Sequence, residues 1–178
     1  LKQKIVDRRP FGNIVYQDRM QETQKEYEPL FEAPEARVLV VDDSNMNRMV
    51  ISRLLSSTKV QVDTAANGAE CLELTKQKFY HVILMDYLLP DTDGLQLLRA
   101  VHGQENGLCR DSAIIAVTGN TISGAHQVYM EQGFDGYVEK PIQGKALESE
   151  ILQFLPMDII EQSRDENITM ENVGQIGR

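Results

Sequence analysis

The sequence has 178 residues, of which 42% are hydrophobic and 25% are charged, as in ordinary soluble globular proteins rather than disordered or fibrous ones. This length is sufficient for one domain with a well-formed core plus extensions, and it is short for two domains. Acidic residues outnumber basic ones by 27 to 18, and the formal net charge of −9 argues against sequence-independent binding to nucleic acid or anionic membranes.

The two cysteines, Cys71 and Cys109, show no CxxC spacing, so neither a disulfide framework nor a zinc site is indicated and a reducing compartment is expected. No apolar run approaches membrane-spanning length, and the opening LKQKIVDRRP lacks the apolar stretch of a signal peptide. These features favour a cytoplasmic location. The first residue is leucine rather than methionine, which suggests a processed or excised fragment.

From Arg37 onward, short apolar runs alternate with amphipathic segments. The runs predict strands at Val38–Val41, Val60–Thr64, Val82–Met85, Ala113–Val117 and Tyr137–Val138, and the segments between and after them predict helices at Asn45–Ser57, Ala69–Lys78, Leu95–His102, Thr121–Gln132 and Gly144–Leu155. Asn67 and Glu70 form a capping box for the second helix. Strands that are apolar throughout fit a parallel sheet with helices on both faces, so we expect a doubly wound α/β domain.

The two ends of the chain differ from this alternating region. Residues 1–35 combine short apolar patches with the polar run QDRMQETQKEYE, which is compatible with a solvated helix, and residues 157–178 are polar and acidic without a strong period. We expect linkers or docking segments at both ends.

Polar side chains stand at the carboxyl ends of four predicted strands. Asp42 and Asp43 follow the first strand, Asp86 the third, Thr118 the fourth and Lys140 the fifth. In a parallel sheet these ends share one edge, so three carboxylates, a hydroxyl and an ammonium group should converge there. Three acids repel one another unless a cation such as Mg²⁺ compensates, and a lysine can pair with a phosphoryl oxygen. The predicted chemistry is phosphoryl transfer onto a carboxylate.

Four segments, RVLVVDDSNMNR, VILMDYLLPDTDG, SAIIAVTGN and GFDGYVEKPI, resemble in order and spacing the receiver domains of two-component response regulators. The resemblance covers about Ala36–Leu155 and implies a receiver domain over residues 36–156. It also implies a flavodoxin-like fold, a five-stranded parallel sheet of strand order 2-1-3-4-5 with helices on both faces.

The resemblance implies a role for each residue at the sheet edge. Asp86 would be the phospho-acceptor and would attack the phosphorus of a phosphohistidine on a histidine kinase or a histidine phosphotransfer domain. Asp43 and Asp86 would bind Mg²⁺ directly, Asp42 would bind it through water, and the backbone carbonyl of Leu88 would add a ligand. Lys140 would pair with the acyl phosphate, and the Lys140–Pro141 bond would be cis.

Two further residues would carry the signal. Thr118 would move towards a phosphoryl oxygen and Tyr137 would follow it inward, which would remodel the face formed by the fourth helix, fifth strand and fifth helix. Structural alternatives stay open, since Thr118 could cap the next segment and Tyr137 could be a core residue. We interpret Asp91 and Asp93 as turn and N-cap residues rather than ligands.

In this family, the positions two residues after the acceptor and two after the threonine tune the lifetime of the phosphorylated state. They are Leu88 and Asn120 here. Leucine cannot hold a hydrolytic water by hydrogen bonding, so slow self-dephosphorylation is expected unless Asn120 compensates.

The junction EYEPLFEAPEARVLVVDD looks like that of hybrid sensor histidine kinases, and the chain shows neither a kinase histidine motif nor ATP-binding glycine motifs. We expect a receiver module of such a kinase, cytoplasmic or the cytoplasmic part of a membrane-bound sensor, with a single-domain regulator as the lesser alternative. Such a module is a partner-dependent switch that catalyses its own phosphorylation and dephosphorylation. A homodimer is compatible, whereas direct contact with nucleic acid or membrane is not expected.

Three rival functions have weaker support in the sequence. An inactive receiver-like domain would serve only in protein binding or dimerisation. A phosphatase with an aspartate nucleophile would resemble DxDx(T/V) after the first strand, which VVDDSNM does not match. A calcium loop at DTDG has its glycine too early and lacks the closing glutamate.

Overall fold

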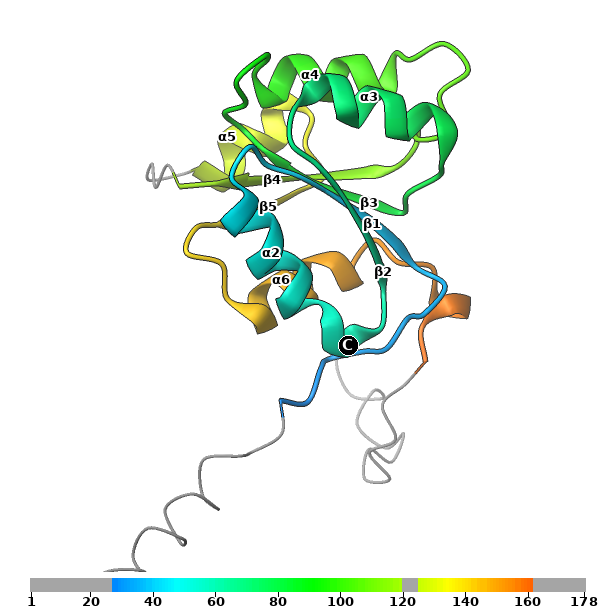
Figure 1. The fold of residues 1–178 in the computed structure, drawn as a ribbon. Helices are drawn as coiled ribbons and strands as arrows, with labels where there is room; N and C mark the ends of the chain where they lie inside the picture. The colour runs from blue at the N-terminus through cyan, green and yellow to red at the C-terminus, as the bar shows by residue number, and fades with distance from the viewer. Residues whose placement is uncertain (1–26, 120–124, 162–178) are drawn as a thin grey trace, which may run out of the picture.

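The protein is described by a computed structural model that covers residues 27–119 and 125–161. Its strands are β1 (Arg37–Val41), β2 (Gln61–Ala65), β3 (Val82–Asp86), β4 (Ala113–Thr118) and β5 (Gly136–Glu139). They form one parallel sheet in the order β2-β1-β3-β4-β5 (Figure 1). The expected doubly wound, flavodoxin-like topology is therefore confirmed.

In the described part of the chain, five helices cover the two faces of this sheet. They are α2 (Asn45–Leu54), α3 (Gly68–Gln77), α4 (Gly94–His102), α5 (Ala125–Gln132) and α6 (Gly144–Leu152), with 3-10 turns at Ser56–Thr58 and Met157–Ile159. Helices α3, α4 and α5 lie on one face, and α2 and α6 lie on the other (Figure 1). Each helix follows a strand, as the alternating pattern predicted. Within the described residues, no helix is long and apolar enough to cross a membrane.

Two predicted helices end more than one residue earlier than expected. The first was predicted to reach Ser57, but α2 ends at Leu54 because the chain tightens into a 3-10 turn that is closed by Lys59 in the left-handed conformation (φ 60°). The last was predicted to reach Leu155, but α6 ends at Leu152, and the following turn brings Leu155 into the core. The beginning of the fourth predicted helix, residues 121–124, lies outside the described residues.

The core has two layers because successive side chains of a strand point to opposite faces of a sheet. On β1, Val38 and Val40 pack towards the α2/α6 face, whereas Leu39 and Val41 pack towards the α3/α4/α5 face. Strand β3 is buried along its whole length, including Asp86. A carboxylate at the tip of such a strand has a fixed backbone position.

The segment before β1 packs against the α2/α6 face. Phe31 and Ala33 are buried in that core layer. The carboxylate of Glu148 on α6 is fully buried and accepts hydrogen bonds from the Tyr27 hydroxyl (2.7 Å) and the Leu30 backbone N–H (2.8 Å). Lys145 lies over the Tyr27 ring with its Nζ 4.8 Å from the ring centroid. The folded unit therefore begins several residues before the first strand.

Candidate functional site

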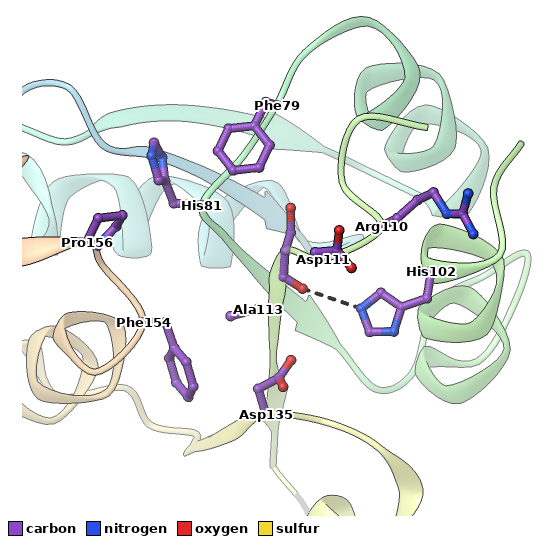
Figure 2. A pocket seen from close by; sticks show the side chains of 10 residues that line it. Phe79, His81, His102, Arg110, Asp111, Ala113, Asp135, Phe154 and Pro156 are labelled. Atoms are coloured by element: carbon purple, nitrogen blue, oxygen red, sulfur yellow. Dashed lines mark hydrogen bonds between the residues drawn. The ribbon is translucent and has the colours of Figure 1, made fainter. Parts of the chain in front are cut away.

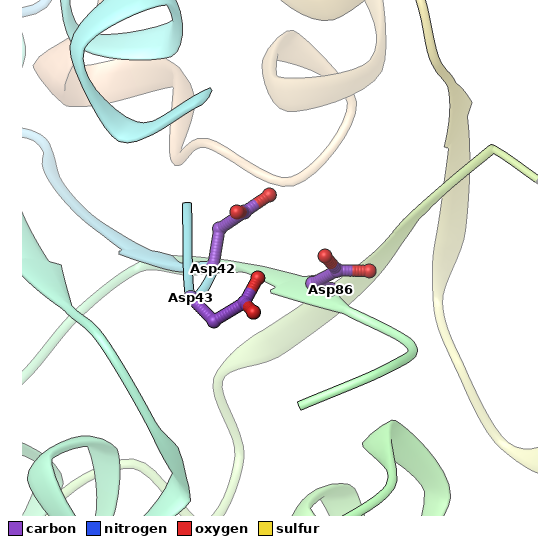
Figure 3. Close-up of side chains that lie close together, drawn as sticks. All are labelled: Asp42, Asp43 and Asp86. Carbon is purple, nitrogen blue, oxygen red and sulfur yellow. The ribbon is translucent and has the colours of Figure 1, made fainter. Parts of the chain in front are cut away.

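The carboxyl ends of the strands bring three acidic side chains together. Asp42 and Asp43 directly follow β1, and Asp86 is the last residue of the neighbouring strand β3. One carboxylate oxygen from each of the three lies within 4.8 Å of those of the other two (Figure 3). Asp42 and Asp86 are buried and Asp43 is exposed. The predicted convergence of acids at one sheet edge is therefore present in the fold.

Lys140 joins two of these acids. It follows β5, and its Nζ donates to Asp42 Oδ2 and to Asp86 Oδ2, both at 2.8 Å. Burial acts to lower the pKa of Lys140, but the hydrogen bonds to Asp42 and Asp86 outweigh it and raise the pKa above its ordinary value. Lys140 is therefore a fixed positive charge between the two buried carboxylates. The Lys140–Pro141 peptide bond is cis, as expected.

The environment of Asp86 opposes its negative charge. Burial raises the pKa of Asp86 above its ordinary value, and the charge of Asp42 adds to this. Hydrogen bonds from Lys140 and from the Leu88 backbone N–H (3.3 Å) act in the opposite direction without cancelling it. A cation at this position would stabilise the charged carboxylate. The carboxylate oxygens gathered here are donors that Mg²⁺ prefers.

Helix α2 fixes the orientation of Asp42. Asn47 Nδ2 lies 3.1 Å from both carboxylate oxygens of Asp42, and the Ser44 backbone N–H donates to Oδ1 at 2.8 Å. Arg48 donates to the backbone carbonyls of Asp42 (2.6 Å) and Asp43 (3.1 Å). Neither Asn47 nor Arg48 was predicted from the sequence to support the acidic pair. The signal that could have identified them is their position in the first turn of a helix that starts directly after Asp42 and Asp43.

The loop between β3 and α4 carries Leu88, a residue that is 73% exposed. A bridge between Leu88 and Asp93 closes this loop. A Cβ on Gly94, the first residue of α4, would lie 2.9 Å from Tyr87 Cα and 3.1 Å from the Asp86 carbonyl oxygen. Only glycine therefore allows α4 to begin this close to the backbone of the candidate acceptor.

Asp91 and Asp93 hold the ends of helices rather than facing the acidic cluster. Asp93 is the N-cap of α4 and accepts from the Gln96 backbone N–H at 2.7 Å. Asp91 accepts from the backbone N–H groups of Gly68 (2.9 Å) and Ala69 (3.0 Å) at the start of α3. These bonds, that from Gly68 first, lower the pKa of Asp91. Both carboxylates are engaged, which weakens the calcium-loop alternative.

The two candidate switch residues lie beside a group of aromatic side chains. Thr118 is buried at the end of β4, and the Tyr129 hydroxyl of α5 donates to its Oγ1 at 3.4 Å. The half-buried Tyr137 ring stacks on Tyr129, with centroids 5.4 Å apart and planes inclined by 14°. Asn120, the second candidate lifetime residue, lies outside the described residues.

A separate surface hollow of about 490 Å³ lies at the opposite edge of the sheet (Figure 2). Its lining includes His81 just before β3, Ala113 at the start of β4, and Asp135 just before β5. His102 Nε2 lies 3.4 Å from the Ser112 carbonyl oxygen at its wall. None of the candidate site residues lines this hollow, so it is separate from the acidic cluster.

Comparison with known proteins identifies the family of this chain. The family model of the response regulator receiver domain matches residues 38–152. The chain belongs to this family. Among solved structures, this receiver domain is similar to chemotaxis protein CheY4 of Vibrio cholerae, with 29% identity and a TM-score of 0.60 over 67% of this chain and 98% of the other.

Another similar structure is the receiver domain of a sensor histidine kinase from Pseudomonas aeruginosa, described with a magnesium ion coordinated in its active site cleft. It is 31% identical, with a TM-score of 0.59 over 67% of this chain and 96% of that one.

Curated relatives of the receiver domain are much longer proteins. Two-component system protein A of Emericella nidulans is 38% identical over 113 residues, which are 62% of this chain and 16% of the relative. Hybrid signal transduction histidine kinase I of Dictyostelium discoideum is 32% identical over 145 residues, which are 79% of this chain and 8% of the relative. The chain thus spans less than a fifth of the length of the curated relatives it matches. Several of these relatives are histidine kinases.

Proposed function

We propose that this receiver domain of a two-component system accepts a phosphoryl group on Asp86 from a phosphohistidine, with Mg²⁺ as cofactor. One observation carries the proposal: Asp42, Asp43 and Asp86 converge with Lys140 at the carboxyl edge of the sheet. Packing alone does not require three acids and a lysine at one edge, and burial of the Asp42 and Asp86 carboxylates there costs stability.

The residues fit a magnesium ion. Asp43 and Asp86 would bind it directly, Asp42 would bind through water, and the Leu88 carbonyl would supply a further oxygen; these are the hard oxygen donors that Mg²⁺ selects. Bound there, the ion would offset the charge of the acids and of the incoming phosphoryl oxygens. Asn47 and Lys140 would keep the Asp42 carboxylate in place for this role.

In the proposed transfer, a carboxylate oxygen of Asp86 attacks the phosphorus of the donor. An O–P bond forms as the P–N bond to the imidazole breaks, and the imidazole nitrogen leaves with the electron pair of that bond. The ammonium group of Lys140 exchanges a carboxylate partner for a phosphoryl oxygen and stabilises the charge there. Strand β3 is buried throughout and so fixes the backbone position of the attacking carboxylate.

The surroundings of the acidic cluster support docking of a protein donor. Met46 (67% exposed) and Met49 (60% exposed) lie on α2, and the exposed Leu88 lies on the β3–α4 loop. Exposed apolar side chains beside a reactive group favour contact with a protein surface. A histidine kinase or a histidine phosphotransfer domain is therefore the partner proposed, and direct contact with nucleic acid or membrane is not part of the proposal.

Leu88 also supports a long-lived phosphorylated state. Its apolar side chain lies two residues after Asp86 and offers no hydrogen bond to a water that would attack the acyl phosphate. We propose slow self-dephosphorylation on this ground, together with switching of the face formed by α5, β5 and α6 through Thr118 and Tyr137.

The relatives support a place in a hybrid histidine kinase, since similar segments occur there. A cytoplasmic location belongs to this proposal, and the free, buried Cys71 and Cys109 agree with a reducing compartment. Residues 1–35 and 157–178 would then serve as linkers or docking segments around the receiver, although Phe31 and Ala33 of the first segment are part of its core. A homodimer stays compatible.

Incubation with acetyl phosphate and Mg²⁺, followed by intact mass measurement, tests the proposal. The expected result is a gain in mass of one phosphoryl group. The gain should be absent when Mg²⁺ is chelated before the incubation, and absent in Asp86→Asn. Asp93→Asn is the matched control, because asparagine caps a helix as well as aspartate does and should leave the gain intact. An unmodified wild-type protein would favour the alternative, a receiver-like domain used only for protein binding.

A further inference from the structure

We propose that Tyr129 is a positioning residue that holds Thr118 and Tyr137 in their resting places and so sets the threshold of the switch. This inference rests on the proposed function, in which both residues move after Asp86 is phosphorylated. The observation behind it is that one buried side chain contacts both of them.

The hydroxyl of Tyr129 acts on Thr118. It donates to Thr118 Oγ1 at 3.4 Å, which is long for a hydrogen bond between two hydroxyl groups. A long bond between neutral groups is weak, so a phosphoryl oxygen, which is a stronger acceptor, can replace it. Tyr129 therefore contributes to the resting position of Thr118 without locking it.

The ring of Tyr129 acts on Tyr137. The two rings are stacked with centroids 5.4 Å apart. Tyr87, the residue after the acceptor, meets Tyr129 edge to face at 5.2 Å. Phe134 completes the group with a T-shaped contact to Tyr129 at 5.9 Å. Movement of Tyr137 inward must change its stacking on Tyr129, so the ring links β5 to the neighbourhood of Asp86.

Both contacts stabilise the resting state relative to the switched state. A ligand that favours the switched state must overcome these two contacts. Its apparent affinity is lower when less of the free protein is in the switched state. Removing the hydroxyl while keeping the ring should therefore make the switch easier to trigger. The net strength of one neutral hydrogen bond corresponds to a change of roughly two- to tenfold in that equilibrium.

Titration of the full chain with beryllofluoride, a phosphoryl mimic, in the presence of Mg²⁺ tests this, with the NMR signal of the Thr118 methyl group as the readout. In Tyr129→Phe, the midpoint should fall roughly two- to tenfold, and the methyl signal of the free protein should already be displaced towards its bound position. Tyr80→Phe is the matched control, because it removes another buried hydroxyl, one that donates to Asp63 at 2.8 Å far from the switch.

The outcomes separate the two proposals. If wild-type protein binds the mimic and its Thr118 signal moves, but Tyr129→Phe has the same midpoint and methyl position, the role of Tyr129 is refuted while the proposed function stands. If the mimic does not bind wild-type protein, the proposed function fails and the inference with it. The ring signals of Tyr129 in wild-type protein give a second measurement that needs no variant: they must shift with the same midpoint as Thr118, and constant signals would refute the inference.

Discussion

Replacing the candidate acceptor should stabilise the fold. In wild-type protein the buried Asp86 lies beside Asp42 and Asp43, with Lys140 as the positive partner of Asp42 and Asp86. Burial, which is the main cause, raises the pKa of Asp86, so its charged form is less stable in the folded than in the unfolded chain. Asp86→Asn removes this charge and leaves the bond between Lys140 and Asp42 possible.

The expected gain is about 0.5–2 kcal/mol in the free energy of unfolding at neutral pH without Mg²⁺, the size that single stabilising substitutions commonly reach. The sign of the pH dependence follows from the raised pKa of Asp86 in the folded state. Below the unfolded pKa of about 4 both forms are neutral and the gain is absent. It develops as pH rises through the window between the unfolded and folded pKa values of Asp86, and it is complete above the folded one.

Urea unfolding followed by far-UV circular dichroism suits a chain without tryptophan. Mg²⁺ at ten times its dissociation constant should stabilise wild-type protein by about 1.4 kcal/mol. It should stabilise Asp86→Asn much less, so the difference in the free energy of unfolding between the two proteins should become smaller. Asp93→Asn, on the same loop, should match wild-type protein under all conditions. The reasoning is refuted if Asp86→Asn is no more stable than wild-type protein at neutral pH, or if Mg²⁺ stabilises both proteins equally.

Three further predictions concern neighbouring residues. Leu88→Asn should shorten the half-life of the phosphorylated protein in Mg²⁺, because a polar side chain can hold the attacking water, and an unchanged or longer half-life measured by mass spectrometry would contradict this. Gly94→Ala should destabilise the fold by about 1–3 kcal/mol and slow phosphorylation, since its Cβ would lie 3.1 Å from the Asp86 carbonyl oxygen. Gly119→Ala should not destabilise the fold, because an added Cβ there would meet no atom of the described residues within 4 Å. Glu148→Ala should lower the free energy of unfolding by about 1–3 kcal/mol and free the segment near Tyr27 to proteases, because the two hydrogen bonds to the buried carboxylate are lost; equal protease resistance in variant and wild type would show that this contact is unimportant.

The fold was largely predictable because its pattern is local. Strands such as β3 and β4 are apolar almost throughout, and only a sheet covered on both faces buries such runs. Strand order was a different matter, since periodicity does not determine it and the resemblance supplied it. The helix ends were missed where the chain makes tight turns, as at Lys59, because such turns depend on single backbone conformations.

The sequence predicted the candidate site residues at the strand ends, but it did not predict the contacts that hold the surrounding loops and side chains in place. Parallel strands bring their carboxyl ends together, so the convergence of Asp42, Asp86 and Lys140 followed from topology. The contact of Asp91 with Gly68 joins residues 23 positions apart, and that of Tyr129 with Thr118 depends on how α5 packs on the sheet. Such contacts arise from tertiary packing and leave no periodic signal in the sequence.

Trapping the modified residue tests whether Asp86 is the acceptor. Protein treated with acetyl phosphate and Mg²⁺ is reduced with borohydride, which converts an aspartyl phosphate to homoserine, and is then digested and sequenced by mass spectrometry. The prediction is homoserine at position 86, absent when Mg²⁺ is chelated. Homoserine at Asp42 or Asp43 instead, or at no aspartate in a protein that remains folded, would contradict the proposal that this receiver domain signals through Asp86.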